Sequence, residues 1–459
     1  MKKILTLIII LAFATTGKAQ EFTSSENWVG KMTLGAQKLN IGFTIKTSTD
    51  NKQVCTMDVP EQGAKNIPVT IIKNDKDSLH ISIAALRATY KGGKLSAESI
   101  NGTFTQNGIS LTLNLQPGVS ATTRPQTPQP PFKYTSEEVV FSNKAEGANL
   151  SGTLTYPVNF EKYEKGSVPV VLMITGSGAQ NRDEELFDHK PFLVIADHLA
   201  KNGIASLRYD DRGVGKSTGP TEGTTTINNL ADAKCGIEYL RSLNKFGKTG
   251  VLGHSEGGTI AFMLGADKQA DFIISLAGSA ANGIDVIVGQ NEAVMRQQGV
   301  QQDVISNYTT ALRKLYKDRV AGKKVADKSQ YVDNLCRKNK LTLPDNLKAN
   351  LEKCMTYGDN WLSWFLGYNP RKAISKTKCP VMALNGNLDL QVLSKENLAI
   401  IKKYLPKNNK NIIKEYDNLN HLFQHCTPET AINYGAIEET ISQEVLNDIA
   451  EWINNAKID

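Results

Sequence analysis

One serine in the chain stands in a pattern that favours nucleophilic chemistry. Residues 253–257 read Gly-His-Ser-Glu-Gly, which places Ser255 at the centre of a Gly-x-Ser-x-Gly motif. An apolar strand pattern precedes it and a buried helix pattern follows, so we predict a sharp turn that exposes the serine hydroxyl. The flanking glycines are needed because a Cβ there would collide with neighbouring backbone. At the start of the helix, the amide of Glu256 would face a developing oxyanion.

Such a serine needs an acid and a base, and two later loops supply candidates. Asp389 follows the apolar stretch 381–384, and His421 follows the stretch 411–416. The order Ser255, Asp389, His421 is the one expected when a turn of this kind carries a catalytic triad. His421 would then take the serine proton, and Asp389 would fix the histidine tautomer while the serine attacks an acyl carbon.

Other residues near these loops are weaker candidates for the same roles. Asp417 lies too close in sequence to His421 to be its orienting partner. His425 would point elsewhere, because a helical spacing separates it from His421. His254 lies inside the serine motif and is expected to pack against the sheet.

A loop of small residues at 175–183 follows the continuous apolar stretch 168–174. In this arrangement it supplies the second oxyanion amide, for which we choose Ser177, with Gly178 as the alternative. A phosphate-binding loop is disfavoured because no Lys-Ser/Thr follows and the glycine spacing differs. The glycine-containing stretch 210–217 is expected to be a structural turn braced by an Arg–Asp pair.

These candidates require a sheet that brings the ends of several strands together. From residue 135 to 459, apolar stretches alternate with helical patterns, which indicates a doubly wound, mostly parallel sheet covered on both faces. The expected elements are a hairpin at 138–141 and 150–156, strands at 168–174, 204–209, 247–252, 272–276, 381–384 and 411–416, and helices at 190–202, 226–242, 257–267, 394–405 and 436–456.

The alternation stops between about 282 and 371, where the chain is polar and helical. A helical insertion at this point of a doubly wound domain is expected to form a lid. Near its return to the core lies a cluster of aromatic residues. Trp361 and Trp364 could line a substrate pocket with Phe365 and Tyr368, although packing within the lid is the commoner use of such a cluster.

The part of the chain before this domain predicts a different class of fold. Residues 24–115 contain short alternating stretches separated by turn residues, which favours a small antiparallel sandwich or a partly closed barrel. No catalytic set of residues occurs there, so packing, substrate presentation or carbohydrate contact is the expected role. Residues 116–134 are rich in Pro, Ser, Thr and Gln and predict a semi-rigid linker.

The first residues predict export from the cytoplasm. Lys2 and Lys3 precede an apolar run that ends near Ala14, and small residues at 17–19 are typical of a cleavage site. We therefore expect a signal peptide at 1–19 and a secreted or periplasmic protein. The apolar run is too short to span a membrane, and we expect no integral membrane segment in the mature protein.

Charge and cysteine content limit the possible partners. The formal net charge is +7 without a dense basic block, so nucleic-acid binding is not expected. The six cysteines show no CxxC spacing, and we expect no metal and no cofactor. Cys336 and Cys354 are a plausible local disulfide pair, with free buried thiols as the alternative.

Taken together, the motifs resemble the α/β-hydrolase superfamily, and within it secreted bacterial carboxylesterases of the EstD type, whose relatives are also described as serine aminopeptidase-like or dienelactone-hydrolase-like. The resemblance covers roughly residues 135–459. One departure is Thr175, where many relatives in the superfamily carry histidine. The motifs that carry the resemblance are at 176–183, 208–217, 253–258, 379–392 and 419–424.

Three functions follow as hypotheses. The first is a serine hydrolase that cleaves small-molecule carboxylic esters through an acyl-enzyme. The second is a serine exopeptidase on the same scaffold, which would need acidic groups such as Glu184, Glu185 or Glu256 to bind a peptide terminus. The third is an envelope- or carbohydrate-binding protein with a vestigial hydrolase, which the intact triad disfavours.

Overall fold

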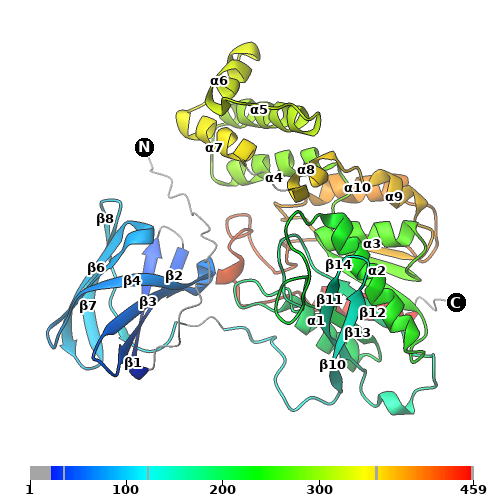
Figure 1. The fold of residues 1–459 in the computed structure, drawn as a ribbon, viewed down its shortest axis with the longest axis horizontal. Helices are drawn as coiled ribbons and strands as arrows, with labels where there is room; N and C mark the ends of the chain where they lie inside the picture. Colours follow the sequence, from blue (N-terminus) through cyan, green and yellow to red (C-terminus); the bar gives the residue numbers. More distant parts are fainter. Residues whose placement is uncertain (1–21, 35–36, 121–122, 357–359, 456–459) are drawn as a thin grey trace. The chain divides into compact units, whose positions relative to one another are not determined.

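The computed structural model describes residues 22–34, 37–120, 123–356 and 360–455. The signal peptide expected at 1–19 lies outside these described residues. The chain divides after residue 121 into two compact units, and each unit has its own hydrophobic core. Figure 1 shows the first unit in shades of blue and the second in cyan-green to red.

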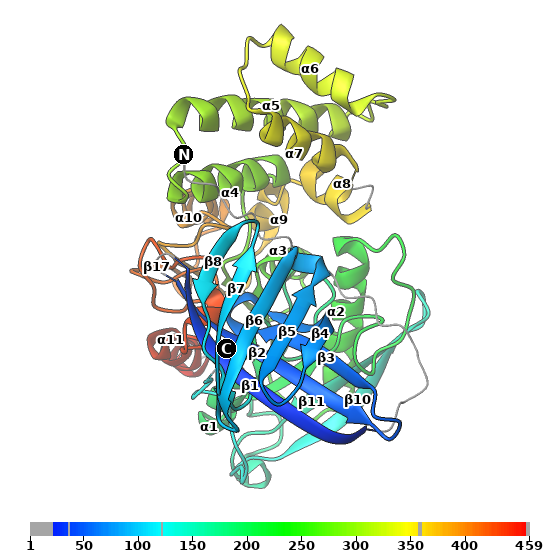
Figure 2. The ribbon, with the colours of Figure 1, turned by 90° about the vertical axis from the view of Figure 1, so that its left-hand side faces the viewer.

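The first unit is one antiparallel sheet in which strands adjacent in sequence pair with each other (Figure 2). The last segment of the unit partly closes the sheet. The backbone amides of Leu113 and Leu115 donate to the carbonyl oxygens of Gly102 and Ile100, and the final strand pairs with the first strand. The unit is therefore a partly closed barrel. In spatial order its strands are β8 (Ile109–Thr112), β7 (Ser99–Gln106), β6 (Ala88–Ser96), β5 (Ser78–Ile83), β4 (Ala64–Asn74), β3 (Gln53–Val59), β2 (Gln37–Ser48), β1 (Phe22–Leu34) and β9 (Gln116–Pro117).

Strands β6 and β7 are not predicted by the alternation pattern, because glycines interrupt it. Gly92 and Gly102 lie opposite each other in the register of these strands. A Cβ at either position would lie 2.6 or 2.4 Å from the hydroxyl oxygen of Tyr90. Tyr90 is fully buried, so its ring fills the space that the glycines leave and offsets their low strand propensity.

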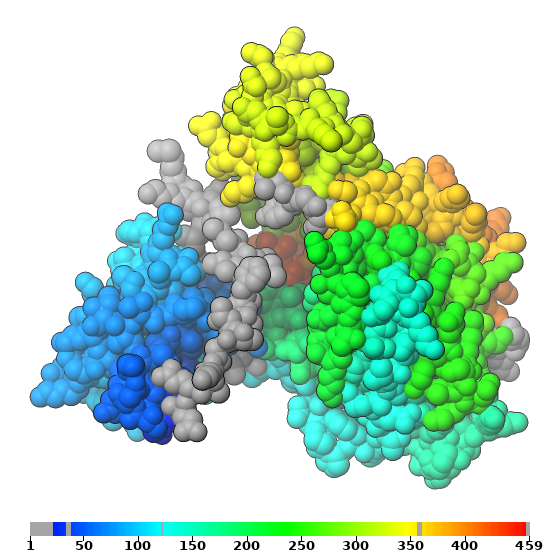
Figure 3. All heavy atoms as spheres, in the orientation of Figure 1, coloured from blue at the N-terminus to red at the C-terminus, as the bar shows by residue number. Residues whose placement is uncertain are grey.

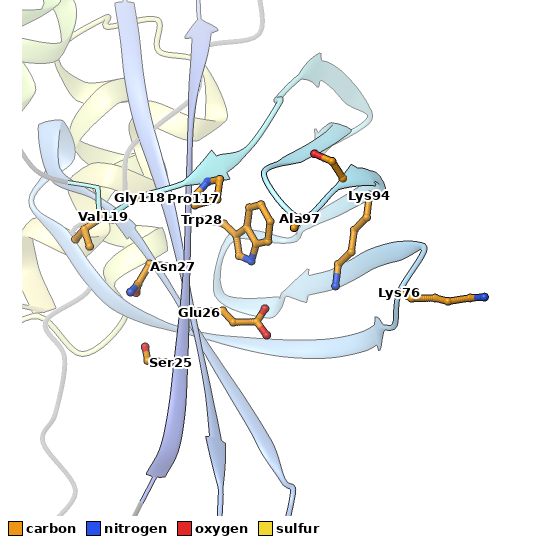
Figure 4. Close-up of a pocket in the computed structure, with 11 residues that line it drawn as sticks. Ser25, Glu26, Asn27, Trp28, Lys76, Lys94, Ala97, Pro117, Gly118 and Val119 are labelled. Atoms are coloured by element: carbon orange, nitrogen blue, oxygen red, sulfur yellow. The ribbon is translucent and has the colours of Figure 1, made fainter.

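A hollow of about 740 Å³ lies on the first unit, where β9 pairs with the middle of β1 (Figure 4). In the figure the Trp28 indole lies between Pro117 and the side chains of Glu26 and Lys94, while Lys76 points away. Its lining residues include no nucleophile with a neighbouring histidine base. The chemistry predicted from the sequence must therefore be sought in the second unit.

The second unit contains an eight-stranded sheet. Its first two strands form a hairpin that pairs antiparallel with the third strand of the spatial order, and the remaining strands are parallel. In spatial order the strands are β10 (Ser136–Asn143), β11 (Ala148–Thr155), β13 (Ala205–Tyr209), β12 (Val170–Ile174), β14 (Thr249–His254), β15 (Phe272–Leu276), β16 (Val381–Gly386) and β17 (Ile412–Tyr416).

Helices cover both faces of this sheet, as expected for a doubly wound arrangement. One core contains sheet residues together with α2 (Thr226–Ser242), α3 (Glu256–Ala266), α9 (Arg371–Lys376) and α10 (Ser394–Tyr404). The core on the opposite face contains α1 (Pro191–Lys201) and α11 (Gln443–Asn455). The expected mostly parallel sheet with helices, preceded by an all-β unit, is confirmed.

A helical insertion separates β15 from β16 at the position predicted from the sequence. It has its own apolar core, to which α4, α5, α6, α7 and α8 all contribute. In Figure 3 the atoms of α5 to α7 are yellow-green to yellow and project from the second unit. The bounds are α4 (Gly283–Gln297), α5 (Gln302–Val320), α6 (Lys328–Lys338), α7 (Asp345–Thr356) and α8 (Asn360–Gly367).

The Pro-rich segment at 116–134 is divided between the two units. Gln116 and Pro117 form β9 of the first unit. Gln126 belongs to the second unit, where its amide oxygen accepts hydrogen bonds from the backbone amides of Thr440 and Ile441. These bonds also explain why the last helix, predicted from residue 436, begins only at Gln443, since both amides are directed at Gln126 instead of at a helical turn.

All six cysteines are unpaired in the structure. Cys336 and Cys354, the local pair considered from the sequence, lie on α6 and α7 and are both free thiols. Of the two alternatives, the structure therefore shows free thiols.

Candidate active site

Ser255 lies at the junction of β14 and α3 in a strained backbone conformation. Its φ is +52° and its ψ is −113°, outside the regions that side-chain-bearing residues usually occupy. Backbone surrounds the turn closely: a Cβ on Gly253 would lie 2.0 Å from the carbonyl oxygen of Gly257, and one on Gly257 would lie 2.1 Å from that of Ile174. Only glycine fits at both positions, so the motif forms the turn predicted from the sequence.

Asp389 and His421 lie side by side after β16 and β17. The Nδ1 atom of His421 is 2.7 Å from Oδ2 of Asp389. The other carboxylate oxygen of Asp389 accepts hydrogen bonds from the amides of Gln391 and Val392, at 2.7 and 2.9 Å. Both members of the pair are buried, at 2% and 3% exposed. An aspartate held in this way orients the Nδ1–H of His421 and leaves Nε2 as the ring nitrogen that can accept a proton.

The loop that carries His421 is held by the side chain of Asn420. Its amide oxygen accepts hydrogen bonds from the backbone amides of Leu422 and Gln424, at 3.0 and 3.1 Å. Asn420 is fully buried. The base is therefore presented from a loop with satisfied backbone groups.

His254, the neighbour of Ser255 in the chain, contacts His421. The Nε2 atom of His254 is 3.0 Å from the backbone carbonyl oxygen of His421, and the two imidazole rings are 4.7 Å apart. No hydrogen bond between Ser255 Oγ and His421 is recorded among the described residues. Such bonds are often long in a site without substrate and shorten when the substrate binds.

The loop after β12 passes directly over the serine. A Cβ on Gly176 would lie 3.3 Å from Cβ of Ser255. The Gly176 amide donates to Oε1 of Glu184 at 2.6 Å and is thereby occupied, whereas Ser177 is exposed and begins the free part of the loop. Of the candidate donors in this loop, the Ser177 and Gly178 amides therefore remain available to a ligand.

Asp211 holds the two ends of the same loop. It accepts hydrogen bonds from Thr175 Oγ1 at 3.0 Å and from the Gln180 amide at 2.9 Å. Burial, together with the neighbouring carboxylates of Glu184 and Glu256, raises the pKa of Asp211 to about 7. The Thr175 hydroxyl thus ties the loop to the turn after β13.

Glu256 follows Ser255 and connects the candidate site to the insertion. Its side chain accepts a hydrogen bond from Thr226 Oγ1 at 2.6 Å and another from Trp361 Nε1 at 2.9 Å. Glu256 is 5% exposed, and burial raises the pKa of its carboxyl. Its backbone amide lies at the N-terminus of α3, where helix amides have no partner within the helix.

The aromatic cluster of α8 separates into two stacked pairs. Trp361 and Phe365 are stacked at 5.3 Å, and Trp364 and Tyr368 are stacked at 4.6 Å. The first pair reaches the site through Glu256. Among the described residues, the second pair forms no hydrogen bond or ring contact with a predicted site residue, so Trp361 is the member of the cluster that adjoins the site.

The other residues considered from the sequence lie elsewhere or have structural partners. Asp417 is exposed and accepts a bond from Asn387, and His425 is exposed and bonds to Glu439. In the turn after β13, Arg212 pairs with Asp232 at 2.7 Å. Asp210 of the same turn pairs with Arg182 at 2.7 Å, which anchors the loop above the serine.

Sequence patterns did not indicate the roles of Glu184 and His254. The Nδ1 atom of His254 lies 2.9 Å from Oε1 of Glu184. Glu184 reaches this position through a left-handed backbone conformation, with φ of +51°, which no spacing rule predicts. Within the described ranges, no group of three His, Cys, Asp or Glu side chains could hold a metal ion.

Comparisons with known proteins agree with this architecture. A family model described as X-Pro dipeptidyl-peptidase (S15 family) matches residues 146–417. The chain is 24% identical over 308 residues to esterase EstD of Thermotoga maritima, a match that covers 66% of this chain and 65% of that protein. The chain thus spans less than two thirds of that relative's length. The expected resemblance to esterases of the EstD type is confirmed.

Solved structures with a similar course of the chain include two esterases. Esterase Pf2001 of Pyrococcus furiosus is 16% identical, with a TM-score of 0.41, and the match covers 74% of this chain and 98% of that chain. Est1E of Butyrivibrio proteoclasticus, solved with ferulic acid bound, is 16% identical, with a TM-score of 0.40, and the match covers 69% of this chain and 98% of that chain.

Proposed function

The chain belongs to the X-Pro dipeptidyl-peptidase (S15) family, and we propose that it is a serine hydrolase that cleaves carboxylic esters of small molecules. The observation that carries this proposal is the pairing of a strained Ser255 with a buried Asp389–His421 hydrogen bond of 2.7 Å. The similarity to esterase EstD favours an ester as substrate. The reaction requires no cofactor.

The mechanism follows from the roles of these groups. His421 Nε2 removes the proton of Ser255 as the oxygen attacks the acyl carbon, and Asp389 stabilises the imidazolium that forms. The amides of Glu256 and Ser177 donate to the oxyanion of the tetrahedral intermediate. His421 then protonates the leaving alcohol, and an acyl-enzyme remains on Ser255. Water, activated by the same histidine, releases the acid and restores the serine.

The helical insertion acts as a lid in this proposal. It joins the sheet beside the site, and Trp361 of α8 bonds to the residue that follows the nucleophile. The stacked rings of Trp361 and Phe365 would form one wall of the acyl pocket. Trp364, also considered as a pocket residue, stacks on Tyr368 and would support the lid from behind.

A serine exopeptidase is the second candidate, favoured by the description of the family. Such an activity needs a negative group free to bind the amino terminus of a peptide. Glu184 and Glu256 are buried and bonded to protein groups, and Glu185 lies 3.7 Å from Lys190. Because these acidic side chains already have partners, we place ester hydrolysis first.

A paired substrate panel tests the assignment. We expect the purified protein to hydrolyse p-nitrophenyl esters from acetate to octanoate, and S255A to lose this activity. Dipeptidyl p-nitroanilides with proline in the second position measure the exopeptidase reaction in the same assay. Higher kcat/KM on the anilides would favour the peptidase, and no Ser255-dependent activity on either series would contradict the proposal.

We also propose that the protein is exported, on the basis of residues 1–19 alone. Over the part of the chain that the structure describes, no helix is both long and apolar enough to cross a membrane. N-terminal sequencing of the protein secreted by a bacterial host that carries the full-length gene tests this. We expect the mature chain to begin at Gln20, and an intact Met1 would contradict export by cleavage.

A further inference from the structure

We propose that Glu184 and His254 form a buried ion pair that positions the site, by holding the backbone of the loop above Ser255 and the backbone of the His421 loop against the nucleophile turn. The pair lies outside the Ser255–Asp389–His421 set and does not touch the reacting atoms. Its effect on catalysis rests on the proposed hydrolase function, whereas its charge state does not.

The hydrogen-bond partners of His254 define its protonation. Its Nε2 atom faces the carbonyl oxygen of His421 at 3.0 Å, and a carbonyl oxygen can only accept, so Nε2 carries a proton. Its Nδ1 atom faces Oε1 of Glu184 at 2.9 Å. A proton must also lie on this line, because two lone pairs would otherwise repel each other.

The surroundings of Glu184 place that second proton on the histidine. The same oxygen, Oε1, accepts the Gly176 amide at 2.6 Å, a bond that favours the ionised carboxylate. Around the His254 ring lie the carboxylates of Glu184 and Asp389 and the imidazole of His421. Burial alone would lower the pKa of His254, but the carboxylate of Glu184 raises it above its usual value.

The pair joins three segments that are distant in sequence. Glu184 holds Gly176 of the loop after β12, and His254 is the last residue of β14. Through Nε2 the same histidine holds the backbone of His421, which follows β17. A continuous chain of hydrogen bonds therefore runs from the loop that offers an oxyanion amide, past the nucleophile, to the base.

Burial and backbone strain indicate that this arrangement is specific. Glu184 and His254 are 6% and 7% exposed. Glu184 has a φ of +51°, a conformation that costs free energy in a residue with a side chain and that directs the carboxylate inward. Burial of both charges is tolerated because each charge has a partner and further hydrogen bonds.

The charge state is measured directly in the resting protein. With ¹⁵N-labelled histidine at pH 7, we expect both ring nitrogens of His254 to show the shifts of a protonated imidazolium, and E184Q to convert one of them to an unprotonated nitrogen. Signals are assigned by their loss in H254Q, or by replacing each of the other histidines if H254Q does not fold. An unprotonated Nδ1 in the wild type would overturn the proposal.

Kinetics separate positioning from a general structural effect. We expect E184Q to lower kcat by about 10- to 100-fold with little change in KM, since a displacement of about 1 Å at the reacting groups can cost that much. E185Q is the matched control, because it makes the same chemical change at the next residue, which bonds to Asn181 and lies near Lys190, and it should keep kcat within about twofold.

The ¹⁵N measurement and the kinetic comparison can each contradict the proposal independently of the other. Wild-type protein without esterase activity would contradict the proposed function and leave the ¹⁵N result to decide the ion pair. An active wild type with equal kcat for E184Q and E185Q would contradict the positioning role, whatever the substrate.

Discussion

The indole N–H of Trp361 donates a hydrogen bond of 2.9 Å to the side chain of Glu256. This bond joins the helical insertion to the residue that directly follows the nucleophile. The bond connects one aromatic ring of the insertion to a buried carboxylate at the start of α3.

We expect Trp361 to limit the length of the acyl chain. Replacement by alanine removes the ring that stacks on Phe365, and the kcat/KM ratio for octanoate over acetate esters should rise about tenfold. W364A is the control, because Trp364 stacks on Tyr368 and should leave the ratio within about twofold. Equal shifts in the two variants would show that the whole cluster only packs the lid.

In the proposed mechanism Asp389 orients His421, so the rate should depend on both the negative charge and the acceptor oxygen of the Asp389 side chain. In D389N the amide cannot hold the Nδ1 proton of the histidine in the same way, and kcat should fall by roughly 10³- to 10⁴-fold with the fold retained. Steady-state kinetics and circular dichroism check this. D417N makes the same chemical change at an exposed residue of a neighbouring loop and should leave kcat unchanged. A D389N variant with near-normal kcat would show that Asp389 has no role in the mechanism.

The turn at Ser255 depends on the absence of a side chain at Gly257. A Cβ there would lie 2.1 Å from a backbone oxygen of β12. In G257A this overpacking should lower the free energy of unfolding by about 3 kcal/mol, which corresponds to a fall in Tm of at least about 5 °C. G367A, on exposed α8 with only an ordinary contact at 3.7 Å, should keep or raise Tm. Wild-type Tm and activity in G257A would show that the turn is not constrained in this way.

Asp211 predicts a pH dependence of stability. Its pKa is raised from 3.8 to about 7, so the folded protein binds this proton more tightly than the unfolded chain. The stability that this proton contributes is present at acid pH and is lost as the pH rises through about 7. Thermal unfolding at a series of pH values should therefore show a steeper decline between about pH 4 and 7 in the wild type than in D211N.

D417N is again the control for this measurement, because Asp417 is exposed. Its stability curve should follow that of the wild type. Parallel curves for wild type and D211N would mean that Asp211 is already ionised throughout this range.

The parallel sheet was predictable because it follows local rules. Helix α2 begins and ends where its pattern predicts, after Thr225, whose side chain caps the helix. Ser255, Asp389 and His421 each follow an apolar stretch, and parallel strands bring such ends to one edge of the sheet. Their order along the chain therefore selects them as candidates, and their catalytic roles stay predictions.

The features that the sequence did not predict depend on contacts between segments that are distant in the chain. The start of α11 is displaced to Gln443 because two amides bond to Gln126, more than 300 residues earlier. Strands β6 and β7 contain glycines whose space is filled by Tyr90. The contact between Glu184 and His254 depends on the conformation of the loop above Ser255, so sequence spacing does not predict the role of either residue.

The central claim is that Ser255 is a nucleophile activated by His421. Incubation with a fluorophosphonate, followed by peptide mass mapping, tests it most directly. We expect one covalent adduct, on the peptide that contains Ser255, no labelling of S255A, and labelling slowed by at least about 100-fold in H421A. An adduct on another residue, or ester hydrolysis that persists in S255A, would contradict the claim.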